Sequence, residues 1–424
     1  MKERSAWWWI PTLYFAEGIP YFIVNNISVT MLNRMGVENG EMALFTGLLY
    51  LPWTIKPLWS PFVDILRTRR WWIVAMQLLM TAAFVFLTLS IPHPETTAGT
   101  PVSLFTWTLI LFTLTAFASA THDIAADGFY MLALDKDKQS FFVGIRSTFY
   151  RLSSIFGQGV LVMIAGLLEQ RTGDIPGAWR TTIGITAAIF ALISLYNIFL
   201  LPKPSSDIRR QTTSAREIFR EFGRAFATFF RKKGVVGAMV FMLCYRLPEA
   251  FMLKMVNPFL LDPVEKGGLA LSTATVGFIY GTVGVIALTV GGIIGGMAAS
   301  RWGLRKSLWP MALSLALPCG VYVWMSLVPT SIWLIGVFAA VEQFGYGFGF
   351  TAYMLYMMRF SDGEFKTSHY AICTAFMALS MMIPGMVAGY LQQWMGYSGF
   401  FIFVMVCCLA TIAVTLRART TVTE

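Results

Sequence analysis

The chain has 424 residues, of which 56% are hydrophobic and only 13% are charged, and its formal net charge is +10. A soluble domain normally has roughly 25% charged residues, so this composition argues against a soluble protein and indicates one embedded in a lipid bilayer. The five cysteines lie within apolar segments and predict neither a disulfide framework nor a metal site.

Apolar stretches of about 20 residues can cross the hydrocarbon core of a bilayer as helices. The sequence contains twelve, so we expect an all-α membrane protein with twelve transmembrane helices. The first six are Trp7–Met31, Met42–Val63, Trp71–Ile91, Leu104–Met131, Phe141–Leu168 and Trp179–Leu201. The second six are Val235–Leu261, Ser272–Ala299, Leu308–Val328, Ile332–Met358, Tyr370–Trp394 and Gly399–Leu416. The first stretch is too long for a signal peptide and lacks a cleavage site.

The basic residues of the predicted loops fall almost entirely on one side of the membrane. The other side has only Arg34, Arg171, Arg180 and Lys266. Because loops rich in lysine and arginine stay in the cytoplasm, we expect both termini to be cytoplasmic. Membrane topology therefore explains the net positive charge, and no nucleic-acid partner is expected.

The longest hydrophilic stretch, residues 202–234, separates the predicted spans into two six-helix bundles, 1–201 and 235–424. Ser214 to Glu217 has the pattern of a capping box, and phenylalanines and arginines follow at helical spacing. We expect a basic amphipathic helix that lies on the cytoplasmic leaflet and links the bundles. A regulatory or partner-binding role for this helix is the alternative.

Acidic and basic side chains inside the predicted spans indicate a polar cavity, because a charge near the bilayer centre costs at least about 2.5–3.5 kcal/mol. Asp123 and Asp127 are four residues apart and face the same side of one helix. Together with Glu17 and Arg151 they are the candidate proton-coupling residues, because a nearby cation changes how readily a carboxylate takes up a proton. A static ion pair with Arg151 is the alternative, and Arg146 is a second candidate partner.

Polar side chains in four of the predicted spans are candidates for binding a substrate. They are Asn25, Asn26, His122, Arg246, Glu249, Lys254, Glu342, Gln343 and Tyr346. Hydrogen bonding between helices and simple aromatic packing are the alternatives for the asparagines and the tyrosine. Arg246 and Glu249 are expected to neutralise one another, whereas Lys254 lies deep in an apolar segment and would suit a carboxylate. Lys56 is expected to extend to the cytoplasmic interface.

Two loops, at residues 61–70 and 295–306, have related sequences in which small or apolar residues precede a basic cluster. The first loop has Asp64 where the second has Ser300. We expect a latch that steadies one state of a transporter, and anchoring by positive charge is the alternative. The expected latch residues are Asp64, Arg67, Arg69, Arg70, Arg301 and Arg305.

Six spans, a basic linker and six further spans resemble the layout of the major facilitator superfamily. Several motifs, in chain order, resemble the AmpG-type muropeptide permeases. They are LWSPFVD at 58–64, THDIAADGF at 121–129, YRL at 150–152, YRLPEA at 245–250, PFLLD at 258–262 and VEQFGYGFG at 341–349. The chain departs from that family at His122, where glutamine is usual, and at Arg246 and Glu249, where lysine and aspartate are usual.

The resemblance implies proton-driven import of anhydromuropeptides across a bacterial inner membrane for cell-wall recycling. Import of a siderophore, or of another large polar anionic solute, is the alternative within the same class. A membrane-embedded enzyme centred on His122 and Asp123, or a sensor, is the alternative of a different class, although no catalytic motif supports an enzyme. We predict a monomeric secondary transporter without a cofactor or metal, whose partners are a small solute, protons and the lipid bilayer.

Overall fold

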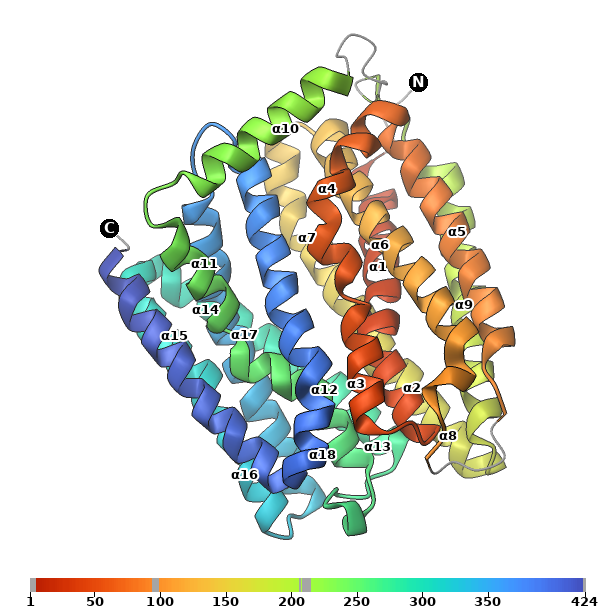
Figure 1. The fold of residues 1–424 in the computed structure, drawn as a ribbon. Coiled ribbons are helices and arrows are strands. Elements are labelled where there is room, and N and C mark those ends of the chain that lie inside the picture. The colour runs from red at the N-terminus through yellow and green to blue at the C-terminus, as the bar shows by residue number, and fades with distance from the viewer. Residues whose placement is uncertain (1–4, 94–98, 206, 208–214, 422–424) are drawn as a thin grey trace.

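The structure, a computed structural model, describes residues 5–93, 99–205, 207 and 215–421, and all of its regular elements are helices (Figure 1). The predicted all-α fold is therefore confirmed. By length and composition, nine helices within this described part of the chain could cross a membrane. The predicted number of twelve spans, the cytoplasmic termini and the bundle boundaries stay predictions.

The helices before the linker make up what we call the first half. They are α1 (Ile10–Phe22), α2 (Ser28–Arg34), α3 (Asn39–Leu48), α4 (Leu51–Leu66), α5 (Arg69–Ser90), α6 (Thr106–Ala133), α7 (Lys136–Ser154), α8 (Val162–Thr172) and α9 (Ile175–Leu200). The linker contains α10 (Ala215–Phe230).

The helices after the linker make up the second half. They are α11 (Val235–Cys244), α12 (Leu247–Leu261), α13 (Thr273–Phe278), α14 (Val285–Trp302), α15 (Leu304–Ala316), α16 (Gly320–Leu327), α17 (Ile332–Phe360) and α18 (Lys366–Thr421). The last helix contains Gly396, whose φ of +67° is readily adopted only by glycine, so α18 consists of two helices that meet at this break.

The two halves lie side by side, with α5, α8 and α9 of the first half on the right of Figure 1 and α11, α14, α15 and α16 of the second half on the left. Helix α10 runs along the top of the molecule, which we call the basic end, and α13 and α16 lie at the opposite or far end. The halves contact each other mainly through α3 and α4 against α18, and through α8 against α13.

Three helical runs widen into π-helical turns, at Ile23–Ile27, Ile155–Leu161 and Ile279–Gly284. The first turn follows Pro20, which lacks the N–H group that a regular α-helix would use. A Cβ atom on Gly281 in the third turn would lie 2.0 Å from a backbone oxygen of the second. Glycine is therefore needed at this position, where the halves meet. π-Helical turns are frequent at functional sites.

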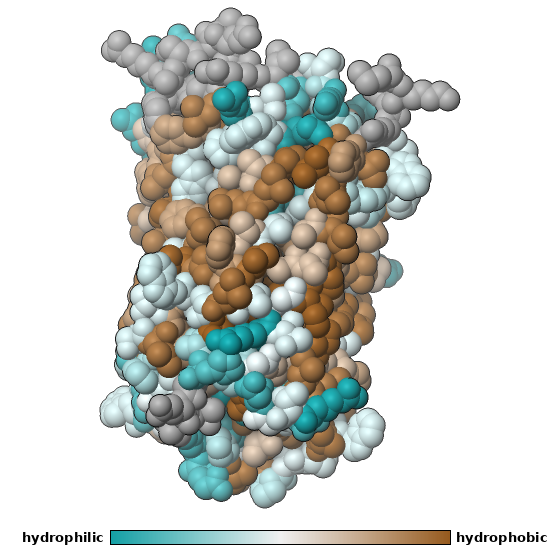
Figure 2. Space-filling view, turned by 90° about the vertical axis from the view of Figure 1, so that its right-hand side faces the viewer, coloured by the Kyte–Doolittle hydropathy of each residue, from teal (hydrophilic) through white to brown (hydrophobic). Residues whose placement is uncertain are grey.

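The outer surface is that of a protein surrounded by lipid. Figure 2 shows hydrophobic side chains over the middle of one face, with hydrophilic residues gathered toward both ends. Large apolar side chains such as Leu89, Leu192 and Trp333 are exposed by 73%, 67% and 85%. In water such a surface would drive aggregation, so a bilayer is the environment that suits it.

The linker forms the predicted helix, but its apolar face does not lie only on lipid. Phe229 is fully buried, and its ring packs against Phe360, His369 and Phe376 of the second half. Helix α10 also contacts α4 of the first half. Protein therefore covers part of the apolar face at Phe229, and the expected position of the helix on the leaflet stays a prediction. Ser214 of the expected capping box lies outside the described residues.

Candidate functional site

Three carboxylates from two helices of the first half lie together in the interior. Glu17 belongs to α1, and Asp123 and Asp127 are one turn apart on α6. Their carboxylate oxygens lie within 4.8 Å of one another, which confirms that the two aspartates face the same side. Like charges this close cannot all remain ionised without compensation, so the cluster requires cations, protons or both.

Two cationic side chains bind this cluster. The ammonium group of Lys56 on α4 contacts the carboxylate of Asp123. Arg146 on α7 binds Asp127 at 2.8 Å, and its guanidinium lies 4.6 Å from the ring centre of Tyr14. The prediction that Lys56 extends to the cytoplasmic interface is wrong, because α4 packs against α6 and a counter-charge lies within reach of the side chain.

Arg151, the predicted partner of the two aspartates, points in another direction. It follows Arg146 by five residues, which turns it by about 140° around the helix. Its guanidinium lies beside Gly292 of α14, in the second half. The alternative of a static ion pair with Arg151 is therefore not supported. Arg146, the second candidate partner, provides the counter-charge of Asp127.

The three carboxylates are also close enough to hold a metal ion. Two of them already bind Lys56 and Arg146, so a metal ion would have to displace a side-chain cation. The arrangement therefore suits the exchange of a proton better than the coordination of a metal.

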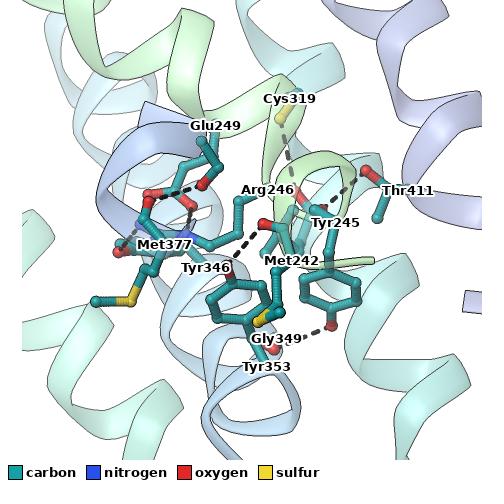
Figure 3. A network of polar contacts seen from close by, with 12 residues as sticks. Met242, Tyr245, Arg246, Glu249, Cys319, Tyr346, Gly349, Tyr353, Met377 and Thr411 are labelled. Atoms are coloured by element: carbon teal, nitrogen blue, oxygen red, sulfur yellow. Dashed lines mark hydrogen bonds and ion pairs between the residues drawn. The ribbon is translucent and has the colours of Figure 1, made fainter. Parts of the chain in front are cut away.

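A second charged site lies in the second half, on α12 (Figure 3). Arg246 binds Glu249 through two contacts of 2.8 Å, and it also donates to the hydroxyl of Tyr346 at 2.9 Å. The guanidinium lies 4.7 Å from the ring centre of Phe350. The predicted mutual neutralisation of Arg246 and Glu249 is confirmed, and their side chains are each only 6% exposed.

A break between α11 and α12 positions this pair. Pro248, in the first turn of α12, has no N–H group, and the backbone of Arg246 is not helical. The carbonyl of Tyr245 accepts a hydrogen bond from Thr411 at 3.0 Å, and the hydroxyl of Tyr245 donates to Gly349 at 3.0 Å (Figure 3). A broken helix is tolerated within a membrane where neighbouring residues satisfy the freed backbone groups in this way.

Glu342 and Gln343 link helices within the second half. The amide of Gln343 donates to Glu342 at 2.9 Å and to Tyr280 at 2.8 Å, and Tyr322 donates to Glu342 at 3.4 Å. Both predicted residues are buried. Their partners come from the third π-helical turn and from α16, so they connect α17 to its neighbours.

The asparagines predicted on the first span lie in the first π-helical turn. Asn25 donates to the backbone of its own helix at Tyr21, and Asn26 donates to Gln158 in the second turn at 2.9 Å. Asn26 and Gln158 line a small pocket together with Asn257 and Tyr280 of the second half. Gln158, Asn257 and Tyr280 were not predicted, because an isolated polar residue in an apolar span gives no sign of which helix it faces.

His122 lies away from these groups. It is fully buried, and its Nε2 atom lies 3.1 Å from the amide of Gln77 on α5. Gln77 in turn accepts a hydrogen bond from Asn197 on α9 at 3.3 Å. The prediction that His122 binds substrate is therefore not supported, because its ring faces helix packing inside the first half, on a different side of α6 from Asp123.

Aromatic side chains of the first half lie beside the acidic cluster and were not predicted. The ring of Tyr21 lies 5.1 Å from Trp53, and 6.5 Å from both Tyr50 and Tyr150. Tyr21 follows Glu17 by one helical turn, and Trp53 precedes Lys56 by about one turn. A group of aromatic rings therefore lies next to the charged cluster.

Lys254 lies on α12, where the second half meets the first. It is 1% exposed, and its ammonium group donates to Thr46 of α3 at 3.1 Å. The ring centre of Tyr50 lies 5.3 Å from the same nitrogen. Among the described residues no carboxylate lies within ion-pair distance of Lys254, so its burial in an apolar segment, as predicted, comes without a counter-charge.

Hydrogen bonds close the far end between the halves. The buried carboxylate of Asp262 accepts from Asn33 at 2.9 Å, from Asn39 at 3.3 Å and from Tyr397 at 2.6 Å. Asn33 and Asn39 belong to the first half, whereas Asp262 and Tyr397 belong to the second. Asp262 is the last residue of the PFLLD motif, so the sequence drew attention to it. Its partners are far away in the chain, so its contacts could not be predicted.

The predicted latch residues lie at the basic end. The backbone N–H groups of Arg69 and Arg70 donate to Asp207, and the guanidinium of Arg70 donates to carbonyl oxygens at the end of α9. Arg67 lies over the ring of Trp71. Arg301 and Arg305 are exposed, and the side chain of Asp64 is outside the description. The latch stays a prediction.

A cavity of about 480 Å³ lies at this end of the second half, between α14, α17 and the start of α18. Ser300 lines it together with Thr351, Arg359 and Lys366. Lys366 binds Asp362 at 3.0 Å and so lowers the pKa of that carboxyl group below its usual value.

Comparisons with known proteins agree with this architecture. The family model "Major Facilitator Superfamily" matches residues 12–368. The "Putative transporter AmpG 4" of Rickettsia conorii is 24% identical over 97% of this chain and 95% of its own length. The "Anhydromuropeptide permease" of Escherichia coli is 23% identical over 96% of this chain and 79% of its own length. A crystal structure of a POT family transporter has a TM-score of 0.74 at 11% identity, over 98% of this chain and 96% of that one.

Proposed function

Because the chain belongs to the major facilitator superfamily, we propose that it is a proton-coupled importer of anhydromuropeptides in a bacterial inner membrane. Membership makes it a membrane transporter and not an enzyme. The solute is proposed from its similarity to relatives named as AmpG transporters and an anhydromuropeptide permease.

The observation that carries proton coupling is the charge balance of the acidic cluster. Within the described part of the chain, three carboxylates share two cations, Lys56 and Arg146, so one negative charge is left without compensation. Lys56 binds Asp123 and Arg146 binds Asp127, whereas the Oε2 atom of Glu17 is buried without a hydrogen-bond partner. Glu17 is therefore the carboxylate that best accommodates a transported proton.

The charge balance also suggests how the proton would change the protein. With a proton on Glu17 the cluster is neutral. The two halves can then enclose the cluster without burying an unpaired charge. Without the proton the cluster carries one net negative charge, which is stabilised when water reaches it. Asp127 is 40% exposed in this structure and provides the contact with water through which the proton would leave.

The test is uptake of labelled anhydromuropeptide into proteoliposomes under an imposed proton gradient. Glu17→Gln should abolish accumulation while leaving counterflow exchange largely intact, because glutamine mimics the protonated carboxyl group. Glu265→Gln, at an exposed loop position, is the matched control and should accumulate solute normally. Loss of both accumulation and exchange would mean that Glu17 holds structure or solute. Accumulation of ferric siderophores, without transport of muropeptide, would overturn the proposed solute.

A further inference from the structure

Lys254 differs from the three cations that bind the carboxylates described above. Lys56 and Arg146 each bind a carboxylate of the acidic cluster, and Arg246 binds Glu249. Lys254 is enclosed to 1% exposure, yet its contacts are one hydroxyl and one aromatic face. Neither contact neutralises an ammonium charge, and an unpaired buried charge is costly.

Both contacts of Lys254 come from the opposite half. Thr46 donates its own hydroxyl hydrogen to the carbonyl of Met42, so its oxygen is free to accept from Lys254. Tyr50, which presents its ring face, lies at the junction of α3 and α4. The second half supplies only the packing of the aliphatic stem, which lies against Gly385 of α18.

The seam between α3 and α18 encloses this ammonium group, and glycines bring the two helices close together. A Cβ atom on Gly389 would lie 1.8 Å from the backbone oxygen of Asn39, and one on Gly47 would lie 2.7 Å from the side chain of Met386. Any motion that opens the far end must separate these helices, and it would remove Thr46 and Tyr50 from Lys254 together.

We infer that Lys254 is a receptor for a carboxylate of the solute, available only when the far end is open. In that state the ammonium would line the outward-facing cavity without a partner. A carboxylate there would form a charge-assisted hydrogen bond, which is about twice as strong as a neutral one. When the seam closes, Thr46 and the ring of Tyr50 return to the ammonium and displace the carboxylate toward the basic end.

This inference rests on the proposed function only in requiring an anionic solute and halves that rock against each other. The inference adds that a carboxylate of the solute is recognised, and that it is bound when the far end is open. The carboxylate can belong to the lactyl or peptide part of a muropeptide, or to another anionic solute, and the experiments below separate these sources.

The first experiment compares transport of a carboxylate solute with its amidated, neutral analogue. Lys254→Gln should raise the half-saturation concentration for anhydromuropeptide about 10- to 100-fold and leave that for the amidated analogue nearly unchanged. Lys266→Gln, at an exposed position of the same end, should change neither. An equal effect on both solutes, or no effect on either, would overturn the inference.

The second experiment needs no solute. Lys254→Cys is introduced into a chain whose five native cysteines are replaced, and a membrane-impermeant thiol reagent is applied from the far end. Labelling should be slow in the closed state and several-fold faster when Asp262→Asn weakens the far end. A cysteine at Lys266 should label equally fast in both backgrounds. If labelling depends on the state but muropeptide is not transported, the inference stands and the proposed solute is wrong. If labelling is equally fast in both backgrounds, the inference itself is wrong.

A third variant guards against misfolding. Lys254→Met removes the unpaired charge and keeps an unbranched side chain that is only one atom shorter, so its melting temperature should be equal to or above that of the native chain. A lower melting temperature would mean that Lys254 mainly holds the structure together, which would overturn its role as a receptor.

Discussion

The ion pair between Arg246 and Glu249 allows a quantitative test of the second half. Two contacts of 2.8 Å join these side chains, and each is only 6% exposed. Glu249→Gln keeps the size of the side chain but removes its charge. Arg246 would then remain buried with the hydroxyl of Tyr346 and the ring of Phe350 as its main partners.

Removing one partner of a buried ion pair costs about 3–5 kcal/mol. The amide oxygen of the new glutamine can still accept one hydrogen bond, and the aromatic face of Phe350 still attracts the guanidinium, so we expect the lower end, about 3 kcal/mol. This corresponds to roughly a hundredfold change in the unfolding equilibrium constant. Changing Arg246 to Gln as well removes the unpaired charge and should recover about 2 kcal/mol of the loss.

The assay is reversible unfolding in mixed detergent micelles, applied to both single variants and the double variant. The resulting double-mutant cycle gives the coupling free energy between the two side chains. The exposed pair Asp362 and Lys366, whose side chains are 73% and 64% exposed, is the matched control and should give less than about 1 kcal/mol. A coupling for Arg246 and Glu249 no larger than this control would refute the reasoning.

Three further variants test the contacts between elements. Asp262→Asn should loosen the far end, because it weakens the hydrogen bonds of this side chain. Cysteines placed at the far end should then be labelled faster, and unchanged labelling would count against a gate at this residue. Gly389→Val should keep α3 and α18 apart and stop transport, whereas Gly336→Val, where no atom lies within 4 Å of the added Cβ, should transport normally. Phe229→Ala should cost about 3–5 kcal/mol of unfolding free energy and make the linker sensitive to protease, whereas Phe230→Ala, at a side chain already 46% exposed, should have a much smaller effect on both.

The parts of this protein that sequence reasoning predicted depend on neighbours within one helix. Apolar length identifies the membrane helices, because a bilayer imposes one thickness on all of them. The four-residue spacing of Asp123 and Asp127 places them on one face, and the three-residue spacing of Arg246 and Glu249 allows them to pair. Each inference uses only the geometry of a single helix. The structure bears out the two spacings and the all-helical fold, whereas the number of twelve spans stays a prediction.

The parts that were wrong or missed depend on how helices are rotated against each other. Lys56 and Asp123 are 67 residues apart in the chain, and nothing near either residue shows that α4 turns this lysine toward α6. His122 is adjacent to Asp123, but the turn of about 100° between neighbouring residues directs it toward Gln77 and not toward the charged cluster. The contact of Asn39 with Asp262 spans 223 residues and both halves.

The distribution of these contacts bears on how such a protein can move. The ion pairs of Lys56 with Asp123 and of Arg246 with Glu249 each lie within one half, so they can remain intact while the halves rock. The contacts that Lys254 and Asp262 make across the halves with other described residues are hydrogen bonds without an opposite charge. Breaking a hydrogen bond to a charged group costs about 1.5–3 kcal/mol, and water replaces part of that loss when the seam opens. The strong pairs therefore keep each half rigid, and the weaker contacts at the seam allow the far end to open and close in each cycle.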